Sequence, residues 1–466
     1  MSLVSFPKNA ERGACPAALR APQTVEETGL APTFLVELLA KVMFQHGLAR
    51  LTELGTHLGL AGAVVEQLTA FMRREGLVEV SRRGATDSDV QFDLTGAGRL
   101  RAAEWLARNL YTGPAPVTLE AYRERVAAQS IVHQRITQAE VRKAFAGLVV
   151  APELQDQLGT AFNSGRPMLL HGEPGAGKTW LAEHLHRLLR GTVLVPHAIA
   201  VDTEVVRVFD PHWHTPAAAP GGGARSALDN RARPDARWVA CERPRVVSGG
   251  ELTLEMLDLS FDARSGFYEA PPHFKANNGL FIVDDLGRQI VTPRELMNRW
   301  IVPMERRHDH LMLRNGSKFT IPFDLVLVFS SNLPPQSLDD AAFLRRLGHK
   351  IHVGPVAAEA YREIFEQACT AEGMGFDAPS FARLLGELHS RSGRPLLACY
   401  PRDLAHLVAS RCAYLGEAPA LSPERIVWAW NAYFGTAEEA APAQSGGAAG
   451  TGASAQSEHT ETGSPR

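Results

Sequence analysis

The stretch from Met168 to Trp180, MLLHGEPGAGKTW, decides the fold of this 466-residue chain. A short apolar run, Met168 to His171, leads into a glycine-rich turn and then into an amphipathic segment that begins near Lys178. From Gly172 to Thr179 the residues match G-x-x-x-x-G-K-[ST], a loop in which small residues let successive backbone N–H groups turn toward the phosphates of a nucleotide. The sequence therefore predicts a strand, a P-loop and a helix in direct succession.

Each residue type in this loop has a physical reason. The glycines permit backbone angles and a close approach to the ligand that a side chain would block. Lys178 would place its charge on the terminal phosphates, and Thr179 would ligate Mg²⁺. The start of the following helix adds unpaired N–H groups that favour anions. We expect nucleotide contacts from the whole segment, which comprises Gly172, Glu173, Pro174, Gly175, Ala176, Gly177, Lys178, Thr179 and Trp180.

A second motif, GLFIVDD, runs from Gly279 to Asp285 and is an apolar strand that ends in two carboxylates. The carboxyl end of a buried parallel strand opens onto the ligand crevice. Asp284 would hold Mg²⁺ there and Asp285 would orient the attacking water. Another buried strand, 325–329, precedes Asn332, whose amide would point at the terminal phosphate or the water. Taken by itself, the carboxylate pair would be interpreted as an ordinary capped strand end.

In this order, the motifs resemble those of the AAA+ ATPases. The match assigns Walker A to Gly172–Thr179, Walker B to Asp284–Asp285, sensor 1 to Asn332, the arginine-finger region to Arg345 and Arg346, and sensor 2 to Arg402. The resemblance covers about residues 130–435. It implies an α/β AAA+ P-loop domain, with a parallel sheet flanked by helices and a C-terminal helical lid, that binds ATP and Mg²⁺ and hydrolyses ATP.

The resemblance also implies a homo-oligomeric ring of six subunits. Arg345 or Arg346 would act in trans on the nucleotide of a neighbour, and Arg402 would reach the phosphates from the lid. The hairpin expected at 311–321 is similar to that of the family branch containing MoxR-like chaperones and enhancer-binding activators. The whole layout resembles bacterial predicted ATPases described as having chaperone activity.

One residue departs from the family pattern, because most AAA+ proteins have glutamate where Asp285 stands. The shorter side chain draws the carboxylate back by about one bond, and a misplacement of about 1 Å can cost on the order of a hundredfold in rate. Slow turnover and a water held by a shift of the backbone are both open alternatives.

Residues 33–110 show the periodicity of three helices, two short strands and a further helix. This order resembles a winged helix-turn-helix domain, with 62–75 as the recognition-type helix. From Thr33 to Leu110 nine basic residues face nine acidic ones, whereas phosphate contact usually leaves a basic excess. DNA as a partner is therefore not favoured over protein docking or a structural role, although the arginines near the helix end and wing could still cluster: Arg73, Arg74, Arg82 and Arg83.

Composition and pattern predict the domain organisation. The predicted parts are a disordered N-terminus at 1–28, a winged-helix domain at 29–112, a linker at 113–130, the α/β nucleotide-binding domain at 131–354, the helical lid at 355–436 and a disordered tail at 437–466.

No apolar run approaches the length of a membrane span and no secretory signal is present, so we expect a cytoplasmic protein without a membrane partner. The net charge of −3 gives no global sign of nucleic-acid affinity, and the five scattered cysteines lack the spacing of a zinc site. His212 and His214 could place two imidazoles on one face of a strand for a metal. Because no third ligand is in view, a loop with incidental histidines is the favoured interpretation.

Three functions are compatible with these motifs. The leading prediction is a ring-forming, chaperone-like ATPase that remodels a protein client. The alternatives are an ATP-controlled DNA-binding regulator and a nucleotide-gated scaffold with slow turnover.

Overall fold

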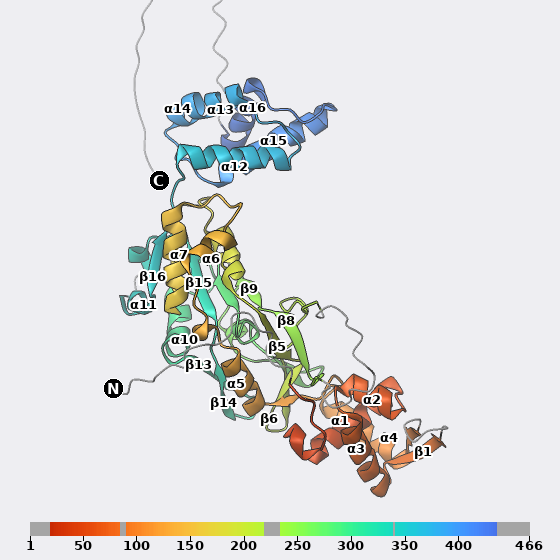
Figure 1. Ribbon diagram of the computed structural model, residues 1–466. Helices are drawn as coiled ribbons and strands as arrows, with labels where there is room; N and C mark the ends of the chain where they lie inside the picture. The colour runs from red at the N-terminus through yellow and green to blue at the C-terminus, as the bar shows by residue number, and fades with distance from the viewer. Residues whose placement is uncertain (1–18, 84–89, 219–233, 339–340, 436–466) are drawn as a thin grey trace, which may run out of the picture. The chain divides into compact units, whose positions relative to one another are not determined.

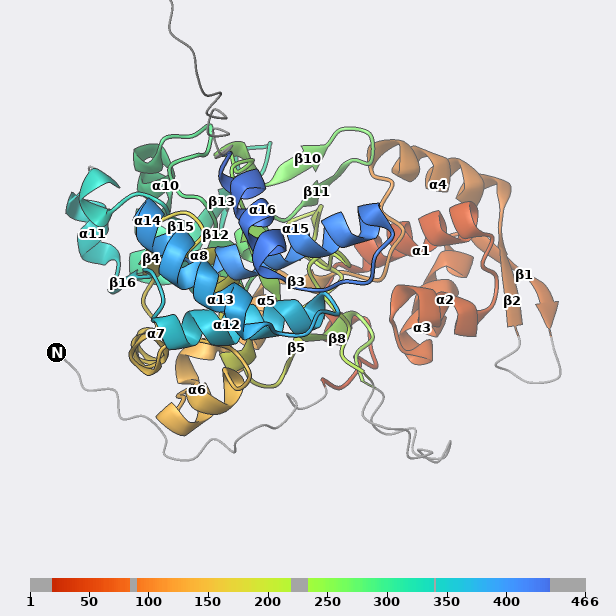
Figure 2. The same cartoon turned by 90° about the horizontal axis from the view of Figure 1, so that it is seen from above.

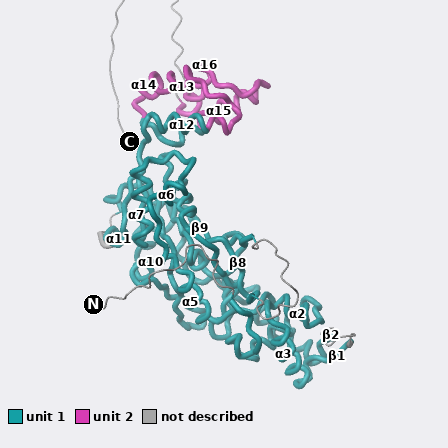
Figure 3. Tube along the Cα trace, viewed as in Figure 1, with its two compact units in different colours: residues 1–367, 395–402 teal, residues 368–394, 403–466 magenta. Residues whose placement is uncertain are grey.

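Residues 19–83, 90–218, 234–338 and 341–435 are described by a computed structural model of the chain (Figure 1). They fall into two compact units, which Figure 3 colours separately. The large unit comprises Met1–Gln367 and Pro395–Arg402, and the C-terminal unit comprises Ala368–Arg394 and Asp403–Arg466. Two helices, α12 (Ala358–Ala371) and α15 (Cys399–Leu415), each contribute residues to both units.

The centre of the large unit is a sheet of five strands in the spatial order β16-β4-β15-β12-β9, and every neighbouring pair is parallel. The strands are β4 (Met168–His171), β9 (Arg245–Ser248), β12 (Leu280–Val283), β15 (Val326–Ser331) and β16 (His349–His352). Every residue of β12 and β15 is buried, as expected where helices cover both faces of a parallel sheet. The predicted α/β fold class is confirmed.

Helix α10 (Pro293–Arg306) shows how the sequence places a helix on this sheet. Its N-terminus has a capping box, because the Thr292 hydroxyl accepts from the Glu295 N–H at 3.3 Å while the Glu295 carboxylate accepts from the Thr292 N–H at 3.1 Å. Trp300 on this helix is fully buried, with ring centroids 5.6 Å from Phe281 of β12 and 5.8 Å from Phe329 of β15. The apolar stripe of α10 therefore covers the strands that carry the second and third motifs.

The large unit contains further helices before and after the P-loop strand β4 in the sequence. These are α5 (Leu119–Ala128), α6 (Gln138–Ala144), α7 (Pro152–Ser164), α8 (Lys178–His184) with the 3₁₀ turn η3 (Leu185–Leu188), α9 (Pro272–Lys275) and α11 (Ala341–Arg346). Helix α8 contacts β4 and β15, and α7 contacts the edge strand β16.

Strands from the segment between η3 and β12, together with the earlier strand β3, form a second sheet whose pairing the sequence did not predict. Its spatial order is β10-β11-β7-β6-β3. The strands are β3 (Val117–Thr118), β6 (Ala198–Val201), β7 (Glu204–Arg207), β10 (Ser260–Asp262) and β11 (Phe267–Glu269). A separate antiparallel pair joins β5 (Thr192–Pro196) to β8 (Trp238–Glu242). We call the second sheet the inserted sheet.

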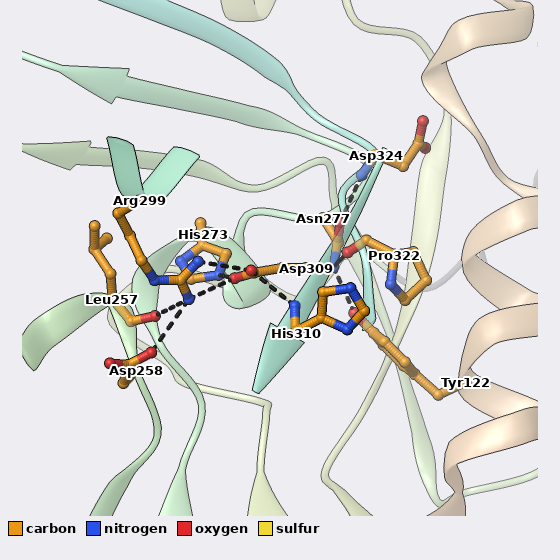
Figure 4. Close-up of polar contacts among 10 residues, drawn as sticks. All are labelled: Tyr122, Leu257, Asp258, His273, Asn277, Arg299, Asp309, His310, Pro322 and Asp324. Carbon is orange, nitrogen blue, oxygen red and sulfur yellow. Dashed lines mark hydrogen bonds and ion pairs between the residues drawn. The ribbon is translucent and has the colours of Figure 1, made fainter. Parts of the chain in front are cut away.

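A hairpin formed by β13 (His308–Met312) and β14 (Lys318–Pro322) packs on the inserted sheet through Leu311, Phe319 and Ile321. Figure 4 shows how a buried polar cluster anchors it. Asp309 accepts from His273 Nε2 at 2.8 Å and from Arg299 Nη1 at 2.7 Å. Burial alone would raise the pKa of Asp309, but hydrogen bonds from His273 and Arg299 lower it to about 2. The hairpin is therefore tied to α9 and α10 by a carboxylate that stays ionised.

The N-terminal part of the large unit has the predicted order of three helices, a two-stranded antiparallel sheet and a fourth helix (Figure 2). Its elements are α1 (Pro32–His46), α2 (Leu51–Leu58), α3 (Gly62–Arg74), β1 (Val78–Arg83), β2 (Val90–Leu94) and α4 (Gly96–Arg108). Its core also includes Ala198 and Val205 of the inserted sheet. Arg237 forms a buried ion pair with Asp235 and donates to the Thr28 carbonyl at 3.3 Å, so this region is packed against the rest of the large unit.

The structure corrects two predictions, one of a disordered segment and one of a linker. Residues 19–28 were predicted to be disordered, yet Val25 and Thr28 are buried, because the apolar side of this short segment covers the helical core. The predicted linker 113–130 contains β3 and α5, with Tyr122 and Val117 buried in the core of the inserted sheet. Residues 1–18, 219–233 and the tail 436–466 lie outside the described residues.

The C-terminal unit is helical. It contains part of α12 and α15 together with α13 (Ala378–Arg383), a π-helical turn η7 (Leu384–His389), α14 (Ser390–Ser392) and α16 (Pro423–Phe434). The Asp377 side chain caps α13 by accepting from the Ser380 N–H at 2.9 Å. His389 of η7 packs edge-on against Trp430 of α16, with ring centroids 4.7 Å apart.

Two short elements complete the large unit. Glu255–Leu257 forms a 3₁₀ turn, η5, in which Leu257 is buried. Helix α2 begins at Leu51, with Arg50 as its cap residue. None of the helices in the described part of the chain combines the length and apolar character required to cross a membrane.

Replacing Trp300 by alanine tests the packing of α10. The change removes a fully buried side chain between two aromatic rings, so the free energy of unfolding should fall by about 3–5 kcal/mol. Val302→Ala, on the same helix but 38% exposed, should cost about 0.5 kcal/mol or less. Urea denaturation followed by circular dichroism would measure both, and similar losses in the two variants would contradict the packing described.

Candidate nucleotide-binding site

The P-loop connects β4 to α8 and depends on glycine at two crowded positions. Gly172 has φ 149°, and a Cβ added there would lie 2.1 Å from the Val353 carbonyl oxygen. Gly175 has φ 86°, and its added Cβ would lie 2.5 Å from Cys399 Sγ. Both positions combine a left-handed backbone with contact from another part of the chain, so any side chain would displace the loop.

Lys178 is the first residue of α8, at the end of the loop, and is only 5% exposed. Its ammonium donates to the carbonyls of Gly172 at 3.0 Å and Glu173 at 2.9 Å, and to Asn332 Oδ1 at 2.7 Å. Burial lowers the pKa of Lys178, while the charges of Asp285 and Asp284 oppose this shift. The structure thus joins the lysine of the first motif to the amide that follows β15.

Thr179 and Asp284 bring a hydroxyl and a carboxylate together from the two predicted metal-binding motifs. Thr179 Oγ1 donates to Asp284 Oδ1 at 2.8 Å. Oxygen donors of this kind suit Mg²⁺, which is bound in proteins through one or two such groups together with substrate phosphates and waters. The pair therefore fits the predicted cation, with Thr179 and Asp284 as the residues that would hold it.

Asp285 follows directly and is one of the few described non-glycine residues with a left-handed backbone, at φ 50°. Its carboxylate accepts from Asn332 Nδ2 at 2.9 Å, and its carbonyl accepts from the Arg288 N–H at 2.9 Å. Aspartate is among the residues that adopt this conformation most readily. The turn therefore provides a backbone reason for aspartate at a position where the resembled family has glutamate.

Two histidines lie beside the loop at the ends of neighbouring strands. His171 of β4 pairs in register with His352 of β16, and their ring centroids are 5.3 Å apart. The pKa of His171 is lowered by burial and then by the nearby charges of His352 and Lys178. His171 is accordingly favoured in its neutral form, which leaves Lys178 as the cation at this end of the strand.

The segment that begins α15 covers the other side of the loop. The Cys399 N–H donates to the Gly175 carbonyl at 3.1 Å, and Ala398 lies 3.9 Å from the position of a Cβ on Gly177. Arg402 is exposed in the first turn of the same helix. Helix α15 starts at Cys399, two residues before Pro401, which is tolerated because N–H groups in a first turn lack helical partners.

The predicted arginine-finger residues occupy the end of α11 and have different surroundings. Arg346 Nε lies 2.7 Å from Glu305 Oε1 of α10 and is half-buried. Arg345 is exposed. The two neighbouring arginines therefore differ in environment, one paired within its own chain and one exposed.

The remaining predicted contacts are spread along the loop and α8. Glu173 and Pro174 are exposed, and Ala176 is buried with its N–H donated to the Glu173 carbonyl at 3.2 Å. Trp180 is 41% exposed, and its ring lies against His184 with centroids 4.0 Å apart.

The histidine pair weighed as a metal site has another role. His214 is buried, with Nδ1 accepting from the Asp210 N–H at 3.0 Å and Nε2 lying 2.9 Å from the Lys275 carbonyl. Both ring nitrogens are thereby used by the protein, and burial lowers the pKa of His214. Across the described residues no group of three or more metal-ligating side chains is found.

Sequence analysis missed residues that support the site from outside the motifs. Gln289 donates to the Asp284 carbonyl at 2.8 Å and accepts from the Gly287 N–H at 2.9 Å. Ser331 Oγ donates to the Leu286 carbonyl at 2.8 Å. These contacts hold the turn after β12 against β15. No local pattern marks them, because Gln289 lies six residues past β12 and Ser331 is the last residue of β15.

Comparisons with known proteins add little beyond this geometry. A family model described as a domain of unknown function (DUF8689) matches residues 357–432, and no curated protein matches the chain. Among solved structures, the chain is similar to NtrX from Brucella abortus in complex with ATP, at 13% identity over 62% of this chain and 58% of that chain, with a TM-score of 0.37. It is also similar to the Thermotoga maritima RuvB Holliday junction branch migration motor, at 14% identity over 65% and 73% of the two chains, with a TM-score of 0.33.

The chain thus spans less than three fifths of the length of that NtrX chain.

Gly175→Ala should disrupt the loop more than an alanine at another left-handed glycine. Gly147 has φ 78° with nothing within 4 Å of an added Cβ, so Gly147→Ala carries only the conformational cost of about 1–2 kcal/mol. Gly175→Ala adds the collision with Cys399 Sγ. We expect the larger fall in melting temperature in Gly175→Ala, and at least tenfold weaker ATP binding in that variant alone, measured by differential scanning fluorimetry and calorimetry. Unchanged ATP affinity in Gly175→Ala would contradict the assignment of the loop.

Proposed function

We propose that this chain is a Mg²⁺-dependent AAA+ ATPase that works as a homo-oligomeric ring and remodels a protein client in a chaperone-like manner. The observation that carries the proposal is the convergence of Lys178, Asn332 and Asp285 past the carboxyl ends of three neighbouring strands. Lys178 Nζ donates to Asn332 Oδ1 at 2.7 Å, and Asn332 Nδ2 donates to the Asp285 carboxylate at 2.9 Å. A structural turn alone does not require a buried ammonium, an amide and two carboxylates from three motifs at one sheet edge.

The residues would divide the reaction as follows. Lys178 and the loop amides bind and orient the terminal phosphates of ATP, since a buried ammonium stabilises charge that develops there. Asn332 is hydrogen-bonded to both Lys178 and Asp285, so a shift of either side chain on ligand binding would move Asn332 and change its hydrogen bond to the other. Asp285 orients the attacking water. Thr179 and Asp284 would hold Mg²⁺, which would supply positive charge against the phosphates.

The left-handed backbone of Asp285 supports a working site in spite of the missing glutamate. Because its carboxylate already lies 2.9 Å from Asn332 Nδ2, the turn supplies part of the reach that the side chain lacks. The scaffold with slow turnover is the second candidate, since a carboxylate held by an amide is less available to a water.

The surroundings of the two arginines favour Arg345 as the residue that acts on a neighbouring subunit. Arg346 is held by Glu305 of its own chain, whereas Arg345 is exposed. An arginine supplied in trans stabilises transition-state charge and is worth on the order of 10³–10⁵ in rate. Arg402, in the helix whose first residue contacts Gly175, would contact the nucleotide from the side of α15.

The surface of α3 supports a protein partner more than DNA. Its exposed side chains include Glu66 and Phe71, with Arg74 over the Phe71 ring at 5.8 Å. Arg73 and Arg74 are also exposed, but Gln67 accepts from the Val25 N–H at 3.2 Å, so this amide is engaged by the N-terminal segment. A DNA-reading helix needs basic and amide side chains free to reach base edges. Docking of a client or regulator is therefore the proposed role of this region.

ATP hydrolysis by the full chain should rise per subunit as protein concentration increases, because the site is completed by a neighbour. Lys178→Ala should abolish hydrolysis, and Arg345→Ala should reduce it by about a thousandfold with ATP binding retained. Arg346→Ala is the matched control and should lose far less. Mixing Lys178→Ala with Arg345→Ala subunits should restore activity, since the first supplies the arginine and the second the nucleotide. A mixture without activity would contradict action in trans.

The client distinguishes remodelling from DNA regulation. An Asp285→Asn chain should bind ATP without hydrolysing it and so retain its partner, while Lys178→Ala serves as the control that does not enter the ATP state. Pull-down of both variants followed by proteomics and nucleic-acid staining should yield proteins enriched on Asp285→Asn. Recovery of nucleic acid without any enriched protein on Asp285→Asn would contradict the remodelling proposal.

A further inference from the structure

A cleft of about 350 Å³ lies between α6 and η3, at the opposite end of the α8–η3 helical segment from the P-loop. It is lined by Ile136, Glu140, Lys143, Ala144, Arg187, Leu188 and Arg190. We call it the α6–η3 cleft. Its volume is within the range of small-molecule sites. Lys178 and Arg187 are nine positions apart, which is about 13 Å along a helix, so the cleft is separate from the nucleotide site.

The charges of the cleft favour an anion. Three of its ionisable groups are cationic, and the single carboxylate, Glu140, is already used. Glu140 Oε2 accepts from the Thr137 N–H and hydroxyl, both at 2.8 Å, and lies 2.5 Å from Arg190 Nη2. Hydrogen bonds from Thr137, with a smaller effect of Arg190, lower the pKa of Glu140 to about 2. Glu140 therefore stays charged and paired, and Lys143 and Arg187 supply a net positive charge.

The two remaining cations are placed on facing elements. Arg187 Nη1 donates to the Ala144 carbonyl at the end of α6, at 3.3 Å, which holds the guanidinium across the mouth of the cleft. A guanidinium has five N–H donors, so this bond leaves most of them for a ligand. Lys143 is exposed on the adjacent turn of α6. An arginine and a lysine together suit phosphate oxygens.

The floor of the cleft is apolar. Ile136 and Leu188 are 6% and 3% exposed, and Ala144 is half-buried. Sites for small organic ligands combine an apolar lining with a few polar groups that fix orientation. The floor would bury a hydrocarbon or aromatic part, while the rim would hold the charged part.

From this combination we propose that the α6–η3 cleft is a second anion-binding site, for a small molecule that carries phosphate groups on an apolar body. The site is independent of the P-loop, and it does not rest on the proposed ATPase function. Because its lining comes from α6 and from η3, which continues the P-loop helix α8, a bound ligand would contact both the start of the α/β region and the 3₁₀ turn that follows α8.

The test uses the full chain carrying Lys178→Ala, so that binding at the P-loop is weakened. Calorimetric titration with tripolyphosphate at low salt should show one saturable site, and ADP should bind more tightly than pyrophosphate because its nucleoside adds contact with the floor. Lys143→Gln/Arg187→Gln should weaken tripolyphosphate binding at least tenfold. Arg142→Gln is the matched control, since Arg142 is on α6 but pairs with Asp156 outside the cleft, and it should change affinity less than twofold.

Both substituted residues are exposed, so the fold should persist, and melting temperatures would verify this. Charge reversal by Lys143→Glu gives a second measure and should weaken binding further than Lys143→Gln. Absence of tripolyphosphate binding to the Lys178→Ala chain would overturn the proposal. An equal loss in Arg142→Gln would also overturn it, because binding would then reflect general surface charge.

Discussion

The parallel pairing of β15 between β4 and β12 is the constraint on which the site depends. Val328 to Ser331 pair with Met168 to His171, and Leu327 to Phe329 with Phe281 to Val283. Residues just past these three strands must therefore emerge at one edge, which is where Lys178, Asn332 and Asp285 meet. Burial of both faces of β12 and β15 makes a shift in register costly, because it would expose apolar side chains or bury polar ones. The strand register that buries the sheet therefore also sets the positions of the site residues.

The surroundings of the P-loop make its glycines a matter of tertiary contact as well as of backbone angle. Val353, at the exit of β16, lies against Gly172, and Cys399, at the start of α15, lies against Gly175. One contact comes from the edge of the central sheet and the other from the segment that leads into the C-terminal helices. A change in the loop conformation on ligand binding would displace both segments, because each is in contact with a loop glycine. These contacts would couple ligand binding in the loop to the segments that follow β16 and precede α15.

The inserted sheet changes how the hairpin before β15 is interpreted. Its apolar side chains are buried against that sheet, and its Asp309 is held by His273 and Arg299. The hairpin is thus a link between α10, which covers the Walker B strand, and the region that shares a core with the N-terminal helices. A similarity of hairpin sequence to another protein would not reveal this, because the partner strands come from segments that have no such motif.

The sequence by itself determined the P-loop, the carboxylate strand, the strand before Asn332 and most N-terminal elements, because each has a local pattern of glycines, apolar runs or turn residues. Only the tertiary structure revealed β9 and β16, since Arg245–Ser248 and His349–His352 are four-residue edge strands whose identity comes from pairing with distant segments. It also separated Arg346, held by Glu305, from the exposed Arg345, and placed Cys399 on Gly175 across more than two hundred residues of chain. Contacts of that separation are selected by the packing of whole elements, which no local stretch of sequence encodes.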